Sequence, residues 1–484
     1  MLTYQDYLEA TDTAAFIAKA ISQHMASAEW KIARDADLYD RQQNVTINRM
    51  TKAYQMAGGG NTAEDAPGLC LASNWFNRFN TQRASYLLGN GVTFTRREKR
   101  ANAEGRLIDV DVTKEELGCD FDNQLYEWGY TALIHGVSFG FWNLDRLLVF
   151  HLTEFVPLWD EETGALRAGI RFWRLTPDKP MTAVLYTEDG YTTYRTKDRS
   201  AGMNFVAVDD NPRPYVEIVE TTEADGEIIA GAENYGAFPI VPMWGSRKKQ
   251  STLVGFRDNI DAYDLIKAGY CTDQRDTAKI YWLIENCGAM DREAMDRFLD
   301  DIKRHHIANV YSDSFTGDAR SALTPYTQEV PYQGNEACLD RLARDMYRDF
   351  GAVDTSTIPA GATNDQIESA YQPMDEEADQ FEVQAIKAIQ QLLRLKGIED
   401  TPQFKRNRTS NVKETVEAVM LLAAYLDPEA VLDHVQFITV DEKERILEHM
   451  DAVNAARLTV DKTAANAAAG NADGAETAGT DDAA

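Results

Sequence analysis

Residues 256–270 have the sequence FRDNIDAYDLIKAGY, in which large apolar side chains recur at steps of three or four residues. This period places one stripe of side chains along a single face, and it predicts an amphipathic helix of about five turns. The members of the stripe are Phe256, Ile260, Tyr263, Ile266 and Tyr270. The segment 238–242 before the helix contains two prolines and should end the preceding region, because proline interrupts both strand ladders and helices.

Downstream of this helix the pattern predicts a short mixed segment. It comprises a strand at 280–284, a helix at 292–304 and a strand at 307–311. A further helix at 335–350 carries four regularly spaced apolar residues, Leu339, Leu342, Met346 and Phe350. A polar loop of small residues follows this helix.

The longest predicted helix begins near Asn364, whose side chain suits an N-cap, and extends for about nine turns to Gly397. Pro373 lies inside this helix and should kink it. Beyond the helix we predict a strand at Gln403-Phe404 and helices at 412–426 and 441–454. From about Leu458 the chain is rich in Ala, Asp, Gly and Thr, and this tail should be disordered for want of residues to bury.

Upstream, the chain combines helices with an antiparallel sheet. A helix beginning near Leu71 stops at the turn residues 89–91, before the strand-like residues 92–94. A helix at 125–133 precedes short β-branched and aromatic runs that continue to Tyr194, and a strand pair is predicted around Asp225-Gly226. The whole pattern predicts an α+β fold that is mostly helical.

The composition sets the size and the charge of the molecule. The chain has 484 residues, and at ~150 residues per domain this length suggests about three units with a sizeable core. Its 78 acidic and 49 basic residues give a formal net charge of -29. Such a balance opposes a protein that grips duplex DNA by neutralising phosphates, and it opposes a basic membrane-surface protein.

Cysteines and terminal signals indicate the compartment. The five cysteines are scattered, without a Cys-x-x-Cys pair, so neither a disulfide framework nor a zinc knuckle is indicated. The N-terminus lacks the features of a signal peptide, and no apolar run approaches the ~20 residues that span a bilayer. We therefore expect a soluble protein made inside a cell, with no membrane partner.

One motif is similar to a catalytic site. Residues 136–140, Gly-Val-Ser-Phe-Gly, match the Gly-x-Ser-x-Gly elbow of serine hydrolases. The elbow needs a strand before the serine and a helix after it, whereas here a helix is predicted before Ser138 and strands after it. A glycine-bounded turn into a sheet is therefore the favoured interpretation, and a hydrolase that uses Ser138 is kept as an alternative.

No cofactor or metal site is predicted. Adjacent His305 and His306 point in different directions on a helix, unlike an i, i+4 pair of metal ligands. Asp109 and Asp111 alternate in a strand-like stretch without a third ligand, so a solvated strand face is favoured. The sequence contains no Gly-Lys dipeptide, and the glycine run at 58–60 therefore lacks the lysine of a phosphate-binding loop.

The charges of the longest helix are unbalanced. Seven acidic residues follow one another without an intervening Lys or Arg: Asp365, Glu368, Asp375, Glu376, Glu377, Asp379 and Glu382. So many like charges would destabilise an isolated helix, and something must neutralise or use them. Small basic patches at 96–100, 247–249 and 405–408 are either solvated surface or partners of a neighbouring subunit.

In their order and spacing, four stretches resemble the portal proteins of tailed bacteriophages, of the siphophage type. They are 74–93, which ends in a Tyr-Leu-x-Gly-x-x-Val signature; 238–264, with an Ile-Asp-Ala-Tyr core; 332–350 with the loop and long helix after it; and 411–448. With the predicted sheet at 136–194, the resemblance covers about residues 30–455. Many relatives open the long helix with Ser-Gly-x-Ala, whereas this chain has Asn-Asp-Gln-Ile-Glu-Ser at 364–369.

The resemblance implies an elongated subunit with wing, stem, clip and crown regions. The implied boundaries are an N-terminal segment at 1–29, a wing with a mixed α/β sheet region at 30–249, a first stem helix at 250–277, a clip at 278–334, a second stem helix at 335–350, a tunnel loop at 351–363, a long kinked wing helix at 364–398, a crown at 399–457 and a disordered tail at 458–484.

The resemblance also implies where functional residues lie. The part of the tunnel loop that would project toward DNA comprises Asp354, Thr355, Ser356, Thr357, Ile358, Pro359, Ala360, Gly361, Ala362 and Thr363. Its small side chains would present low friction, and Pro359 and Gly361 would shape its turn. The implied stem positions are Asp258, Asp261, Tyr263, Asp264, Lys267, Arg341 and Arg344. The implied clip positions facing an adaptor are Trp282, Lys303, Arg304, His305 and His306.

The implied function is a structural channel without enzymatic activity. A homo-oligomeric ring, expected to be dodecameric, would occupy one capsid vertex of the virion after assembly in the host cytoplasm, and double-stranded DNA would enter and leave through it. The implied partners are the large terminase, which would supply energy, a head-tail adaptor, and the major capsid and scaffolding proteins. Ring assembly would gather this acidity around one axis, and repulsion over a Debye length of ~8 Å would keep phosphates off the wall. A second alternative is a capsid or adaptor scaffold without a channel.

Overall fold

The computed structural model describes residues 2–49, 71–101, 107–196, 203–209, 211–222, 226–277, 281–285, 322–326, 332–359 and 361–408, with isolated positions within 293–297 and 417–450. Over these residues the chain is an α+β protein. It divides into two compact units, of which the first is Met1–Val353 with Pro373–Asn407 and the second is Asp354–Gln372 with Arg408–Ala484.

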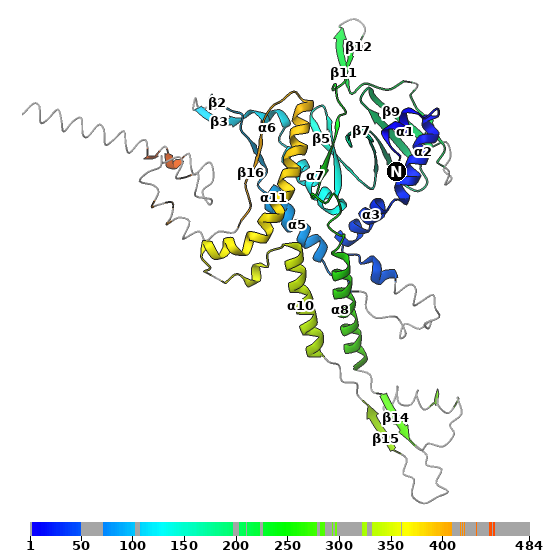
Figure 1. Ribbon diagram of the computed structural model, residues 1–484, viewed down its shortest axis with the longest axis vertical. Helices are drawn as coiled ribbons and strands as arrows, with labels where there is room; N and C mark the ends of the chain where they lie inside the picture. The colour runs from blue at the N-terminus through cyan, green and yellow to red at the C-terminus, as the bar shows by residue number, and fades with distance from the viewer. Residues whose placement is uncertain are drawn as a thin grey trace, which may run out of the picture. The chain divides into compact units, whose positions relative to one another are not determined.

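Helices and strands both contribute extensively to the described residues (Figure 1). The helices are α1 (Tyr4–Leu8), α2 (Thr13–Ala26), α3 (Ala28–Asp40), α5 (Trp75–Leu88), α6 (Val112–Leu117), α7 (Phe121–His135), α8 (Arg257–Thr277), α10 (Tyr332–Phe350), the 3-10 helix η1 (Thr355–Thr357) and α11 (Asn364–Leu395). The strands are β1 (Val92–Phe94), β2 (Arg97–Ala101), β3 (Leu107–Asp111), β4 (Val137–Asn143), β5 (Arg146–His151), β6 (Phe155–Trp159), β7 (Leu166–Trp173), β8 (Thr182–Thr187), β9 (Gly190–Thr196), β10 (Phe205–Ala207), β11 (Val216–Thr222), β12 (Gly226–Glu233), β13 (Ile240–Trp244), β14 (Tyr281–Glu285), β15 (Ala322–Tyr326) and β16 (Pro402–Phe404).

A five-stranded antiparallel sheet has the strand order β10-β9-β8-β7-β6. Its meander turns at Gly164, between β6 and β7, and at Gly190, where the chain passes from β8 to β9, and both glycines have positive φ. Helix α2 lies against this sheet (Figure 1), and its Phe16, Ile17 and Ile21 join one apolar cluster with β-strand residues such as Val156 and Ile170. The N-terminal segment is therefore packed onto the sheet.

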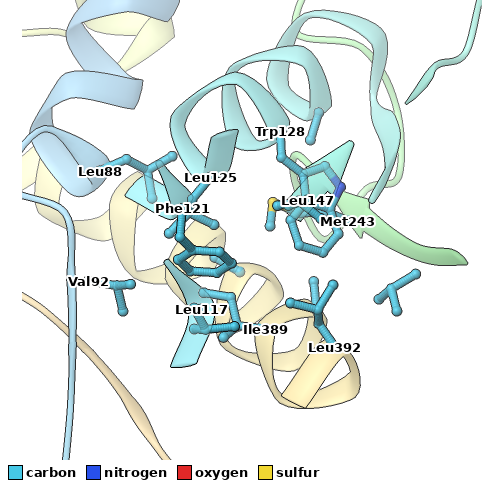
Figure 2. Close-up of a cluster of buried hydrophobic side chains, with 14 of the residues drawn as sticks. Leu88, Val92, Leu117, Phe121, Leu125, Trp128, Leu147, Met243, Ile389 and Leu392 are labelled. Atoms are coloured by element: carbon cyan, nitrogen blue, oxygen red, sulfur yellow. The ribbon is translucent and has the colours of Figure 1, made fainter. Parts of the chain in front are cut away.

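A three-stranded sheet, β13-β4-β5, packs against α7 and the second half of α11. Figure 2 shows Phe121, Leu125 and Trp128 of α7 among Met243 of β13 and Leu392 of α11. The fit is close at Gly140, where an added Cβ would lie 2.7 Å from the Trp128 ring. This cluster joins segments far apart in the sequence into one core. Burial of the apolar surface of these side chains stabilises the fold.

Aromatic rings fill the space between the two sheets. Phe139 of β4 and Phe155 of β6 have ring centroids 4.5 Å apart, and Phe150 and Tyr186 extend the cluster at 5.8 Å. Such pairs add to the free energy gained from burial alone. The two sheets and their helices thus form a single packed platform.

The prediction that residues 238–242 end the sheet region is wrong. Residues 240–244 form β13, and Pro242 pairs in register with Phe139 of β4. A proline is tolerated there because β13 is an edge strand, whose outer side has no ladder partner that needs an N–H donor. Proline therefore marks a sheet edge here.

Several other predictions are confirmed in position. The strand predicted at 280–284 is β14, the strand pair around Asp225-Gly226 is β11 with β12, and the helix predicted at 335–350 is α10, which begins three residues earlier. The partner of β14 is β15, which was not predicted. The predicted helix at 292–304 and strand at 307–311, the helices at 412–426 and 441–454, and the tail lie outside the continuously described residues. No described helix combines the length and apolar character of a membrane span.

Candidate functional site

Helices α8 and α10, the two predicted stem helices, lie side by side (Figure 1). They run antiparallel, because Phe256 beside the start of α8 packs against Phe350 at the end of α10 with ring centroids 5.2 Å apart. Phe79 of α5 contacts both rings, at 5.6 Å and 5.1 Å. The first half of the apolar stripe at 256–270 therefore fixes the helix pair to the platform, whereas Ile266 and Tyr270 are only partly buried.

A buried carboxylate also fixes α8. Asp264 is completely buried, and its two oxygens accept hydrogen bonds of 2.9 Å from Asn44 Nδ2 and from the backbone N–H of Ser73. Burial raises the pKa of Asp264, while the hydrogen bonds from Asn44 and Ser73 oppose this shift. Asn44 is itself fixed, because its Oδ1 accepts from the backbone N–H groups of Thr46 and Ile47.

The first turns of α8 bind α3 through a second polar group. The Tyr39 hydroxyl donates to Asp261 Oδ1 at 2.5 Å, and Arg257 Nη1 lies 3.1 Å from Asp35 Oδ2. Burial and the bond to Asp261 raise the pKa of Tyr39 to about 12, so its hydroxyl stays a donor at neutral pH. Apolar packing and these bonds act together to hold α8 at one place on the platform.

The remaining predicted stem residues differ in their surroundings. Tyr263 packs edge-on against Trp75 at 5.6 Å, and Lys267 is half-buried beside it in a small cavity. Asp258 is exposed. Arg341 and Arg344 of α10 are also exposed, with Arg341 Nε 3.7 Å from Asp345 Oδ2 and Arg344 Nε donating to the Asp340 carbonyl.

Of the predicted clip residues, only Trp282 is described. It lies in β14, opposite Pro325 of β15. Lys303, Arg304, His305 and His306 lie outside the described residues.

A buried arginine fixes the end of α10. Arg83 of α5 is 8% exposed, and its Nη2 donates to the carbonyl of Phe350 at 2.5 Å. Its guanidinium lies 4.2 Å above the Phe350 ring and 3.4 Å from Glu377 Oε2 of α11. Gln82 Nε2 donates to the carbonyl of Val353 at 2.8 Å, so the start of the following loop is held by α5.

The described residues of the loop, 354–359 and 361–363, have defined local structure. Asp354 Oδ1 accepts from the Ser356 backbone N–H at 3.0 Å and so caps η1. The Ala362 N–H donates to the Pro359 carbonyl at 3.0 Å, and Gly361 has φ +89. Pro359 and Gly361 therefore shape a turn, as predicted, since a positive φ at that position favours glycine.

The start of α11 differs from the prediction. Asn364 is the first helical residue, and the cap is Thr363, whose Oγ1 accepts from the Gln366 N–H at 3.4 Å while Gln366 Oε1 accepts from the Thr363 N–H at 3.2 Å. This reciprocal pair is a capping box. Helix α11 continues through Pro373, and its predicted kink stays a prediction.

Basic residues of the same chain neutralise much of the acidic stretch of α11. Arg406 Nη2 contacts Asp379 Oδ1 at 2.5 Å and also bonds Glu382. The Tyr86 hydroxyl donates to Asp375 at 2.5 Å. Within the second unit, Arg408 lies 3.9 Å from Glu368. The basic patch at 405–408 thus has intramolecular partners, which the sequence left open.

The geometry gives Ser138 a structural role. Helix α7 precedes it and β4 contains it, the reverse of a nucleophile elbow, and its buried hydroxyl donates to the Trp128 carbonyl at 2.6 Å. Asp111 is not a solvated strand residue, because its Oδ1 caps α6 through the Lys114 N–H at 3.0 Å. Within the part of the chain that the structure describes, no cluster of three or more ligands could hold a metal.

Sequence reasoning missed several residues that hold α8 and α10 on the platform. Tyr39, Asn44, Ser73 and Arg83 belong to no recognisable catalytic or binding motif, and their partners lie more than 180 positions away in all four cases. Asn44 alone carried a local signal, since an Asn before Val-Thr-Ile is a typical cap. The others are defined only by tertiary packing.

The model of the family described as "Phage portal protein, SPP1 Gp6-like" matches residues 18–455. The chain belongs to this portal protein family. A portal protein of Bacillus phage SPP1 is 23% identical over 435 residues, which cover 84% of this chain and 81% of that protein. A portal protein of Clostridium phage phiCD119 is 23% identical over 245 residues, covering 49% of this chain and 53% of that protein.

A solved structure is also similar to this portal family member. Its title is "Neck of native GTA particle computed with C12 symmetry", and the similarity covers 82% of this chain and 93% of that chain, at 12% identity and a TM-score of 0.39.

Proposed function

We propose that this chain is the subunit of a ring, expected to be dodecameric, at one vertex of a phage capsid. Its central channel carries double-stranded DNA into the capsid during packaging and out of it during ejection. The observation that carries this proposal is the family match over residues 18–455. The antiparallel pair α8–α10 and the long helix α11 supply helices in the order that the family resemblance requires.

In this proposal each part of the chain has a place in the subunit. The two packed sheets with their helices and the long helix α11 form the wing, α8 and α10 form the stem, and the segment with β14 and β15 belongs to the clip. Residues 399–457 supply the crown. The double anchor of α8, apolar at Phe256 and polar at Asp264, supports a stem that keeps its place on the wing while DNA moves.

Charge supports a channel that lets DNA slide. A subunit with a formal net charge of -29 repels phosphates, and a ring concentrates this charge around one axis. Screening by salt limits this repulsion to a Debye length of ~8 Å. The repulsion therefore prevents direct contact between phosphates and the channel wall, but it does not act over longer distances. Tight binding through many Lys or Arg contacts would oppose translocation.

The loop at 354–363 is the proposed tunnel loop. Its bonds at Asp354 and its turn at Gly361 order the backbone locally, so that the loop presents small hydroxyl and apolar side chains without an additional ordering cost. It faces DNA in this proposal, and its small side chains present low friction to the sliding duplex.

The proposed partners follow from the same role. A large terminase supplies the energy of packaging, a head-tail adaptor binds the clip, and the major capsid and scaffolding proteins contact the wing. These partners act on the ring from outside, while the chain itself contributes a passive channel.

Negative-stain images of the purified full-length chain test the proposal. We expect rings with an axial hole. A compact monomer at high protein concentration, or a closed assembly without a hole, would contradict the channel and favour a capsid or adaptor scaffold.

A further inference from the structure

A groove of about 740 Å³ lies in the first unit between the edge strand β13, the turn that joins β6 to β7, and the second half of α11. Its apolar floor includes Trp159 and Trp244, whose rings stack with centroids 5.7 Å apart at 23°. Lys249, Lys387 and Arg394 line it as well, and Lys249 Nζ lies 4.7 Å from the centre of the Trp244 ring. The groove combines aromatic surface with positive charge.

The positive charge of this groove is not balanced by nearby acids. Arg167 at the groove pairs with Glu188 at 2.6 Å. By contrast, Lys249, Lys387 and Arg394 have no ion pair with any described residue. In a chain with a formal net charge of -29, a concave surface with three such cations is complementary to an acidic surface.

Helix α11 itself presents an acidic surface nearer its start. Its first Lys or Arg is Lys387, and the seven acidic residues all precede it. On the exposed side, Glu376 is solvent-accessible and Asp379 is 70% exposed even though it contacts Arg406. Val383, one turn further on, is 49% exposed and adds an apolar side chain to the same face. Within one subunit this acidic face and the basic groove lie at successive positions along one helix.

We propose that the groove of one subunit binds the acidic face of α11, at residues 376–383, from the neighbouring copy in the ring. The inference rests on the ring proposed above and names the surfaces that join its subunits. A ring needs a heterologous interface, in which one patch of each copy meets a different patch of the next, and an acidic face with a basic groove satisfies this requirement. Val383 meets the tryptophan floor while Glu376 and Asp379 meet the cations.

The edge strand supports a helix as the occupant. Strand β13 could in principle accept a further strand, but Pro242 removes one backbone donor from its ladder. A helix needs no backbone bonds from its partner, and it docks through side chains. The groove is therefore suited to a helical face.

Charge reversal in the groove tests the inference. We expect Lys387→Glu with Arg394→Glu to raise the protein concentration needed for ring assembly by roughly tenfold or more, because acids would then face acids across the interface. Equilibrium sedimentation of the full-length protein over a range of protein and salt concentrations measures this shift. The matched control is Arg174→Glu with Lys179→Glu, an equal change of charge at exposed positions between β7 and β8, which should leave assembly unchanged.

A charge swap makes the test specific for the occupant. Adding Glu376→Lys, at an exposed position outside the Arg406 ion pairs, to the groove variant restores opposite charges across the interface, and assembly should return toward that of the unaltered chain. Circular dichroism and thermal melting establish that each variant is folded. Normal assembly of the folded groove variant, or loss of assembly that the swap does not restore, would overturn the inference. If the unaltered chain forms no ring, the proposed function fails; if it forms rings and the groove variant forms them equally well, only this inference fails.

Discussion

Among single residues, Asp264 has the clearest stabilising role. Replacing it with Ala leaves the buried donor Asn44 Nδ2 and the partly buried Ser73 N–H without their acceptor. We expect Asp264→Ala to lower the free energy of unfolding by about 2–4 kcal/mol, because each unsatisfied buried group costs about 1–3 kcal/mol. Asp258→Ala, on the exposed side of the same helix, should change stability by less than about 0.5 kcal/mol. Urea denaturation measures the free energy of unfolding of both variants. Equal losses for Asp264→Ala and Asp258→Ala would contradict the stabilising role of Asp264.

Asp400 predicts a pH dependence of stability. Burial acts to raise its pKa, but hydrogen bonds from Thr113, Thr95, Thr401 and the Arg96 N–H outweigh this and hold the pKa at about 2, below the usual 3.8. Because the pKa of Asp400 is lower in the folded state than in the unfolded state, its ionisation stabilises the fold at pH values above the pKa of the unfolded state. This stabilisation is lost as the pH falls from about 4 through 2.

The corresponding variant is Asp400→Asn. We expect the difference in urea midpoint between the unaltered chain and this variant to be largest at pH 5–7 and to narrow as the pH approaches 2. The exposed neighbour substitution Glu399→Gln should have little effect across this range. A difference that stays constant with pH would contradict the assignment.

Residue identities were only partly predictable from sequence. The turn at Pro359 and Gly361 follows from local backbone preferences and was predicted correctly. The cap of α11 was misassigned to Asn364, because Thr363 with Gln366 forms a capping box one position earlier. Long-range pairs, such as Tyr39 with Asp261, depend on tertiary packing, which no local sequence pattern encodes.

At the scale of elements, Arg406 stabilises α11. It contacts both Asp379 and Glu382, and its side chain is only 18% exposed. We expect Arg406→Ala to lower the free energy of unfolding by about 1–3 kcal/mol, because charge-assisted bonds are lost and two acids are left facing each other. Lys405→Ala, at the exposed adjacent position, is the control and should be nearly neutral. Thermal melting in low and high salt would show the Arg406 effect shrinking as salt screens the acids, and a salt-independent loss would argue for packing instead.

The loop between α10 and α11 is expected to affect DNA packaging. Replacing Pro359 and Gly361 together should leave ring assembly intact and reduce DNA packaging, because the turn with φ +89 at Gly361 would be lost. Electron microscopy measures the rings, and a packaging assay with the terminase measures DNA uptake. Gly397→Ala is the matched control, since Gly397 also has a positive φ, with open space around it, after α11. Unchanged packaging in the loop variant would argue against these residues forming a tunnel loop.

The period of the apolar residues predicted where helices and strands lie, but it did not predict which strands pair. The stripe at 256–270 predicted α8, and the same reasoning predicted α10 and α11. It failed at β13, because a proline was taken as a terminator when the strand lies at a sheet edge. The partnership of β14 with β15 also could not be predicted, since strand pairing depends on contacts between distant residues.

For the whole molecule, membership of the portal family changes how the net charge is interpreted. A formal net charge of -29 opposes a protein that grips DNA, yet it suits the proposed ring, through which DNA would slide. The length suggested about three separate units, whereas the described residues form one large packed unit and a second, smaller one. Sequence alone could not reveal this, because α11 contributes to both.

The most direct measurement is an asymmetric cryo-electron microscopy reconstruction of the virion that contains this chain. The proposed function predicts a ring of this chain at a single capsid vertex, with density for DNA along its axis and the 354–363 loop facing that density. A ring without an axial opening, or the chain distributed over all the vertices, would contradict it.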